Sequence, residues 1–169
     1  MDRSKQPTLQ LVAQAFADAR VPYAIIGGVA MQVHQREPRT TLDIDLAVTR
    51  RDQIPRADLQ RLELRATGVH EHAEKWISQD GTPVQITDDP AFTAAIARTM
   101  VVDIDGLPLR VLGPADLLHA KMRAGCDPKR RRSKRLQDLA DVQALLETHT
   151  ALTAELSADE RAVLDRLPR

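Results

Sequence analysis

The sequence predicts a mixed α/β protein of the α+β class, in which a mixed twisted β-sheet is flanked by helices and is followed by C-terminal helices. A short apolar run at residues 22–27 leads into a helical pattern and then into a second apolar run at 42–48. Only helical patterns follow residue 112. Two further pairs of β-type runs each surround an Asp-Gly dipeptide, which is typical of hairpins; these dipeptides are Asp80-Gly81 and Asp105-Gly106.

The individual elements are placed by apolar periodicity, capping residues and breakers. Asp52 is a candidate N-cap for a helix that Gly68 would end, and Asp89-Pro90 and Ser157 begin two others. The predicted helices cover residues 8–20, 28–36, 52 to about 66, 89 to about 98, 114–124, about 133 to 147, and a short final segment. The predicted strands cover 22–27, 42–48, two stretches within 75–87, 100–105 and 107–112.

Length and composition restrict the class of protein. The 169 residues predict a single domain, with a core over residues 1–112 and a helical segment over 113–169 packed on it. The 24 basic and 24 acidic residues cancel, so no global field favours nucleic acid, and aromatic residues are only 2%. Cys126 is the only cysteine, which excludes an intramolecular disulfide and favours a reducing cytosol. No signal peptide or apolar run near 18 residues indicates a membrane.

The strongest chemical signal is Asp43-Ile44-Asp45, which follows the Gly27-Gly28 turn by one short helix and one loop. Residues i and i+2 of a strand share a face, so both carboxylates are expected to project together while Leu42, Ile44 and Leu46 point into the core. Two adjacent carboxylates suit a hard divalent cation such as Mg²⁺. A strand that enters a helix through glycines exposes backbone N–H groups, which suit a phosphate.

This ordered set resembles the nucleotidyltransferase superfamily with the polymerase beta-like fold, and within it the small AbiEii-type enzymes of toxin–antitoxin and phage-defence systems. The resemblance covers roughly residues 23–146. It is carried by three blocks, which are Gly27-Gly28-Val29-Ala30, Arg39-Thr40-Thr41-Leu42-Asp43-Ile44-Asp45, and a late lysine helix (Asp116 to Lys121) followed by Asp138 and Asp141.

The resemblance implies a Mg²⁺- or Mn²⁺-dependent enzyme that moves NMP from an NTP to a hydroxyl of RNA such as tRNA, of a protein or of a small molecule. It implies an antitoxin as a possible partner. Asp43 and Asp45 would be the catalytic metal ligands and Gly27 and Gly28 would bind the nucleotide. Arg39 and Thr41 would either contact the triphosphate or tie the loop to the acidic strand.

The late helices carry the remaining candidates. Lys121 is either a solvated charge or a phosphate contact that belongs to the nucleotide site. Asp138 and Asp141 share one helix face. They either pair with Lys134 or Arg135, or hold Lys121 and complete the nucleotide pocket.

The sequence departs from the superfamily pattern at the third carboxylate, which active members commonly place on a later strand as the proton acceptor. Gln85 is expected at that position, and an amide cannot accept the proton. Asp80, Asp88 and Asp103 are acidic alternatives that lie away from the matched place. A catalytically degenerate fold that binds a nucleotide or a partner is therefore an alternative to a transferase.

Several other clusters have ordinary explanations. Asp105 of the second Asp-x-Asp is a turn residue before Gly106, and His70-x-His72 is expected to be incidental surface. The basic run Lys129 to Arg135 is either a solvated loop or a track for an RNA backbone, which makes an RNA-binding module a further alternative.

Overall fold

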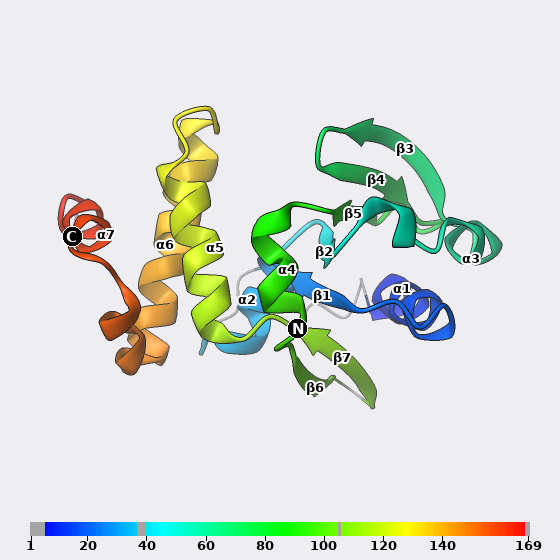
Figure 1. Cartoon of the computed structure of the whole chain (residues 1–169), viewed down its shortest axis with the longest axis horizontal. Coiled ribbons are helices and arrows are strands. Elements are labelled where there is room, and N and C mark those ends of the chain that lie inside the picture. The colour runs from blue at the N-terminus through cyan, green and yellow to red at the C-terminus, as the bar shows by residue number, and fades with distance from the viewer. Residues whose placement is uncertain (1–5, 37–39, 105, 168–169) are drawn as a thin grey trace. The chain divides into compact units, whose positions relative to one another are not determined.

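The computed structural model describes residues 6–36, 40–104 and 106–167 (Figure 1). The chain forms two compact units, of which the first comprises the described residues 6–33, 40–104 and 106–113 and the second comprises 34–36 and 114–167. The boundary at residue 34 separates His34 from the rest of helix α2 (Gly27–His34). None of the described helices is long and apolar enough to cross a membrane.

The first unit is built on a seven-stranded sheet with the order β3-β4-β5-β2-β1-β7-β6. The β2·β5 and β1·β7 pairs are parallel and the other neighbouring pairs are antiparallel, so the sheet is mixed as predicted. The strands are β1 (Tyr23–Ile26), β2 (Ile44–Val48), β3 (Arg65–His70), β4 (Ala73–Ile77), β5 (Pro83–Thr87), β6 (Met100–Ile104) and β7 (Leu107–Val111).

One face of this sheet is apolar and forms the core of the first unit. Ile44, Leu46, Val84, Ile86 and Trp76 are all buried and stand opposite one another across β2, β5 and β4. The first helix, α1 (Gln6–Asp18), packs on this side, since the ring of Phe16 lies 5.2 Å from that of Tyr23. The remaining helical segments of the unit are η2 (Arg51–Gln53), α3 (Arg56–Arg61), η3 (Pro90–Phe92) and α4 (Thr93–Ile96).

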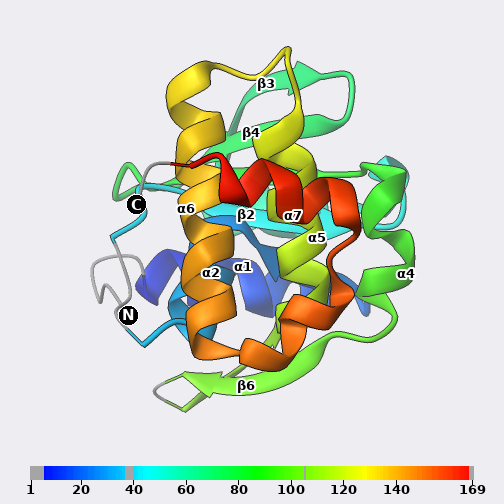
Figure 2. The ribbon, with the colours of Figure 1, turned by 90° about the vertical axis from the view of Figure 1, so that its left-hand side faces the viewer.

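The second unit consists of helices. Helices α5 (Pro114–Cys126) and α6 (Arg132–Thr148) lie side by side, and η4 (Thr150–Glu155) and α7 (Ala158–Asp165) follow (Figure 2). Gly125 allows their close approach, because a Cβ at this position would lie 2.6 Å from Leu139 Cδ2. Ser157 and Glu160 form the predicted capping box of α7.

Most predicted elements are confirmed to within a few residues. Both hairpins are present, and Gly81 and Gly106 adopt φ angles of +83° and +84° at their turns. Asp89 accepts a hydrogen bond from the backbone N–H of Ala91 at 2.9 Å and starts the predicted η3–α4 segment. The turn role predicted for Asp105 lies outside the described residues.

Three expectations were wrong. The helix predicted from Asp52 to about residue 66 stops at Arg61, Asp52 instead pairs with Arg50, and β3 follows. Gly68 therefore lies inside a strand, where the register shifts, rather than at a helix end. Strand β2 begins at Ile44, so Leu42 precedes it and is 78% exposed instead of entering the core.

The two edges of the sheet differ. Edge strand β3 carries Arg65 and His70 and an irregular register, which are features that discourage pairing with another chain. Edge strand β6 pairs regularly with β7 and exposes 47% of Met100 and 63% of Val101.

Candidate functional site

The glycine turn lies directly against the acidic strand. Ile26, the last residue of β1, pairs with Asp45 of β2, and Gly27 follows with a φ of +61°. A Cβ at Gly27 would lie 2.2 Å from Asp45 Oδ2, so any other residue here would force the Asp45 side chain to move. Glycine therefore favours both the left-handed backbone and the close approach of the Asp45 carboxylate.

Gly28 makes the second close approach, because its Cβ would lie 2.3 Å from Thr41 Oγ1. Thr41 is buried, and its hydroxyl donates a hydrogen bond to Asp43 Oδ1 at 2.9 Å. The structure thus brings together five of the predicted residues: both glycines, the threonine and both aspartates. Arg39 lies outside the described residues.

The donor set of this site fits a divalent cation. Asp43 and Asp45 are partly exposed, and the helix that starts at Gly27 begins beside them. No cluster of three or more His, Cys, Asp or Glu side chains is found in the described part of the chain. The protein would therefore supply the cation with the carboxylates of two residues, Asp43 and Asp45. Mg²⁺ commonly accepts one or two carboxylates and completes its shell with water and substrate phosphates.

Gln85 occupies the neighbouring position on β5, in register with Asp45. Directly paired residues of adjacent strands project from the same face of a sheet, so the Gln85 amide stands beside the Asp45 carboxylate. Gln85 therefore lies next to Asp45, and its replacement of a third carboxylate stays a prediction.

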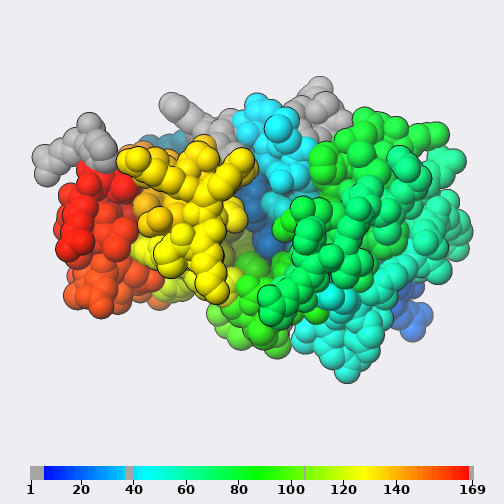
Figure 3. Space-filling model, turned by 90° about the horizontal axis from the view of Figure 1, so that it is seen from above, coloured from blue at the N-terminus to red at the C-terminus, as the bar shows by residue number. Residues whose placement is uncertain are grey.

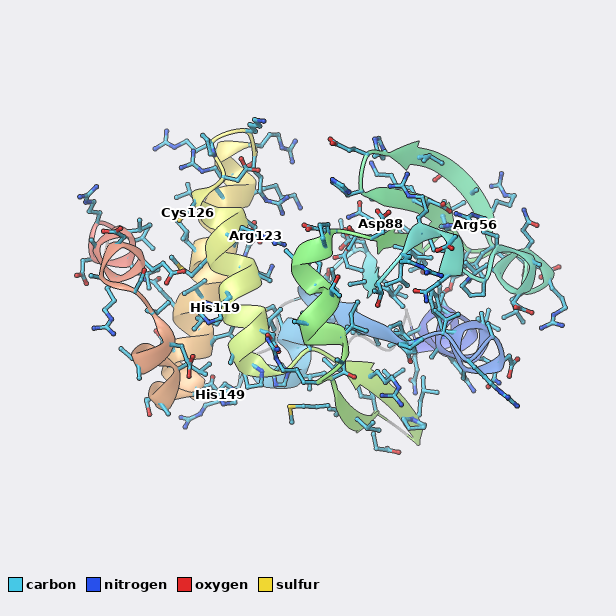
Figure 4. The ribbon with its side chains drawn as sticks, viewed as in Figure 1. Arg56, Asp88, His119, Arg123, Cys126 and His149 are labelled. Atoms are coloured by element: carbon cyan, nitrogen blue, oxygen red, sulfur yellow. The ribbon has the colours of Figure 1, made fainter. Side chains whose placement is uncertain are left out.

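The acidic alternatives are engaged elsewhere. Asp88, labelled in Figure 4, follows β5. Its carboxylate pairs with Arg51 at 3.0 Å. Asp80 sits in the β4–β5 turn, where hydrogen bonds from Ser78 and Thr82, partly opposed by burial, lower its pKa to about 2. Asp103 accepts from the backbone N–H of Gly106 at 2.9 Å in the β6–β7 turn. All three carboxylates therefore have partners of their own in the observed arrangement.

The second unit holds its predicted residues in a buried network. Lys121 Nζ lies 2.9 Å from Asp138 Oδ1 and 2.7 Å from Asp141 Oδ2. All three residues are buried, with 8% or less of each exposed. The aspartates thus hold Lys121, and the alternative that they pair with Lys134 or Arg135 is not observed.

Arg130 is a member of this network that sequence reasoning missed, since its Nε lies 2.7 Å from Asp138 Oδ2. Helical periodicity carries no signal for such a contact, because Arg130 lies in the turn before α6. The segment that contains this turn, yellow in Figure 3, lies at the surface, and the remaining basic side chains of the turn are exposed. His119, Arg123 and Cys126 are exposed on α5 (Figure 4), whereas Lys121 of the same helix is buried.

Comparison with known proteins bears on this arrangement. The model of the family described as "Nucleotidyl transferase AbiEii toxin, Type IV TA system" matches residues 10–168. The chain belongs to the AbiEii nucleotidyl transferase family. No curated protein matches it significantly in sequence.

Solved structures share the fold of this AbiEii family member. An antigenic nucleotidyltransferase-like protein from Paracoccidioides brasiliensis is 19% identical with a TM-score of 0.61, and the match covers 86% of this chain and 77% of that one. The antibiotic-resistance factor ANT(2'')-Ia, in complex with adenylyl-2''-tobramycin, is 17% identical with a TM-score of 0.60 over 98% of both chains. The lincosamide adenylyltransferase LnuA, bound to lincomycin, is 13% identical with a TM-score of 0.57 over 86% and 98%. At these identities the likeness establishes the nucleotidyltransferase fold.

Proposed function

We propose that this chain transfers NMP from an NTP to an acceptor hydroxyl with the help of Mg²⁺ or Mn²⁺. The observation that supports the proposal most strongly is the contact of the Gly27-Gly28 turn with Asp45 and Thr41. In this contact the start of a helix, which favours phosphate, lies beside two carboxylates that favour a cation. The family assignment supports the same reaction class.

In the proposed reaction the acceptor oxygen forms a bond to the α-phosphorus of the NTP. The bond from that phosphorus to the bridging oxygen breaks, and pyrophosphate leaves with the bond's electron pair. The hydroxyl proton would pass to solvent water, because the Gln85 amide beside Asp45 cannot accept it. A bound divalent cation would neutralise phosphate charge and favour ionisation of the hydroxyl.

Each group of residues has a proposed role. Asp43 and Asp45 would hold the cation, while Gly27 and Gly28 would bind phosphate through backbone N–H groups. Thr41 orients Asp43 through its hydrogen bond, and Arg39 would contact the triphosphate. In the second unit, Asp138 and Asp141 hold Lys121 in the buried network.

The site is tested by the double variant Asp43→Asn with Asp45→Asn. We expect it to lose Mg²⁺-dependent NTP binding in calorimetry while its circular dichroism and thermal transition stay close to those of the wild type. Each substitution keeps the side-chain size and removes one charge. Undiminished Mg²⁺·NTP binding by the folded double variant would exclude this site.

The acceptor class is tested with each radiolabelled NTP, Mg²⁺ and total cellular RNA and protein. Label on an RNA or a protein band that is absent with the Asp43/Asp45 variant would identify the acceptor as RNA, for example tRNA, or as protein. The family description supports a toxin role with an antitoxin partner, and the single cysteine suits a cytoplasmic location.

A degenerate fold that binds nucleotide without turnover is the second candidate, and Gln85 is the observation that favours it. We expect Gln85→Asp to raise transfer about tenfold or more, because it restores a proton acceptor beside Asp45. Gln85→Asn is the matched control, since it shortens the side chain without adding a base. NTP binding without transfer by wild type and by Gln85→Asp alike would favour the degenerate fold.

A further inference from the structure

A row of paired residues extends outward from Asp45 across the sheet. Asp45 of β2 pairs with Gln85 of β5, and Gln85 pairs in turn with Lys75 of β4. Because paired residues share a face, the three side chains project from the same side of the sheet. Neighbouring strands are about 4.8 Å apart, so the backbone of Lys75 lies about 10 Å from that of Asp45.

The outer part of this face is cationic. Arg65 and His70 of β3 pair with Ile77 and Ala73 of β4, so they project from the same side as Lys75. Gly68 stands opposite Lys75 on β3 and leaves the lysine open on its outer side. Lys75 and Arg65 are exposed, and no ion-pair partner is found for either among the described residues.

The acidic residue of the same strand points the other way. Glu74 precedes Lys75 on β4, is only 5% exposed, and accepts a hydrogen bond from Arg56 Nε at 3.2 Å. The described residues of β3, β4 and β5 that share the face of Asp45 include no Asp or Glu. Along this row the side chains are therefore negative at Asp45, neutral at Gln85 and positive at Lys75.

We infer that Gln85 and Lys75 are specificity-determining residues, which select an acceptor that carries an anionic group close to its reacting hydroxyl. The inference rests on the proposed transfer at Asp43 and Asp45. The Gln85 amide can donate and accept a hydrogen bond, so it suits a neutral hydroxyl. The Lys75 ammonium attracts a phosphate or carboxylate one strand further out. A polycationic acceptor is disfavoured, because it would meet Lys75 and Arg65 instead of a third carboxylate.

The test compares how tightly the protein binds three acceptor probes in the presence of NTP and Mg²⁺. Ribose 5-phosphate and a short RNA oligonucleotide are the two sources of an anionic group, and tobramycin is the polyamine probe. We expect measurable binding of one or both anionic probes and none of tobramycin. Binding of ribose 5-phosphate would identify a small-molecule source, whereas binding of the oligonucleotide alone would identify RNA. Tighter binding of tobramycin than of both anionic probes would overturn the inference.

Charge reversal at Lys75 makes the test specific. Lys75→Glu is expected to raise the KM or Kd of the anionic acceptor about tenfold or more at low salt, with a smaller ratio at high salt. The KM of the NTP should stay within about twofold. The matched control is Arg61→Glu, which makes the same charge change at an exposed position on α3. Equal effects of the two reversals on acceptor binding would show a general field effect and contradict a role for Lys75.

Failure of the inference is distinguishable from failure of the proposed function. Calorimetry with Mg²⁺·NTP and the Asp43/Asp45 variant tests the transfer site without any acceptor. Acceptor binding by wild type and Lys75→Glu needs no turnover, so it is measured even if transfer is slow. Loss of Mg²⁺·NTP binding in Lys75→Glu would place Lys75 on the nucleotide side and overturn its acceptor role.

Discussion

The two units of this protein each contain a pair of aspartates, and the two pairs differ in burial and in the groups that contact them. In the first unit Asp43 and Asp45 are partly exposed, with a hydroxyl donor and a glycine turn beside them. In the second unit Asp138 and Asp141 are 3% and 2% exposed and both pair with the ammonium of Lys121. Buried charges must be neutralised for the protein to fold, whereas solvent can reach the partly exposed carboxylates of Asp43 and Asp45.

Removal of the Lys121 ammonium from the buried network should produce the largest loss of stability. Lys121→Met leaves two buried carboxylates without their shared partner, and we expect a loss of about 3–5 kcal/mol in the free energy of unfolding. Urea denaturation followed by circular dichroism measures it. Lys134→Met, at an exposed position near the start of α6, is the matched control and should change stability by less than about 0.5 kcal/mol. Similar transitions for both variants would mean that the buried network contributes little.

The glycine turn is tested by Gly27→Ala compared with Gly81→Ala. Both positions have positive φ angles, +61° and +83°, so both variants should lose about 1 kcal/mol from backbone strain. Only at Gly27 would the new Cβ collide with Asp45 Oδ2, whereas nothing lies within 4 Å of a Cβ at Gly81. We therefore expect Gly27→Ala alone to lose Mg²⁺·NTP affinity in calorimetry. Equal nucleotide affinity in the two variants would show that the contact with Asp45 is dispensable.

The carboxylate of Asp80 differs from both pairs, because neutral hydrogen-bond donors stabilise its charge. Its pKa is lowered to about 2 from 3.8, with the Ser78 hydroxyl as the largest cause. A lowered pKa in the folded state stabilises the protein above pH 3.8, and this stabilisation is lost as the pH falls toward 2. Because Asp80 is exposed, we expect on the order of 0.5–1 kcal/mol. Thermal unfolding of wild type and Asp80→Asn at pH 5 and pH 2.5 should give a difference in stability that shrinks at the lower pH.

Local signals predicted the elements whose ends are determined locally. The Asp-Gly hairpins, the Asp89 start and the Ser157 capping box depend on residues within a few positions of one another. Strand β3 was missed because the helix signal around Asp52 extends into residues that instead pair with β4. Leu42 was misplaced because apolar character alone does not distinguish a strand from the exposed turn before it.

The candidate site was predictable to the extent that its residues are close in sequence. Spacing and resemblance placed Asp43, Asp45 and the glycines together, and the register of β2 with β5 agrees with the position expected for Gln85. The role of Lys75 emerged only from that register, because nothing local connects β4 to Asp45. Arg130 likewise reaches Asp138 from a turn, where sequence periodicity has no meaning.

The regular, apolar edge at β6 bears on the behaviour of concentrated solutions. Met100 and Val101 are exposed on an edge strand that lacks the irregular register of β3. The formal net charge at pH 7 is zero, so molecules have little mutual repulsion to keep such edges apart. Colloidal stability should therefore be lowest near neutral pH. A single lysine in place of Val101 should raise solubility by adding charge at the edge where chains would otherwise pair.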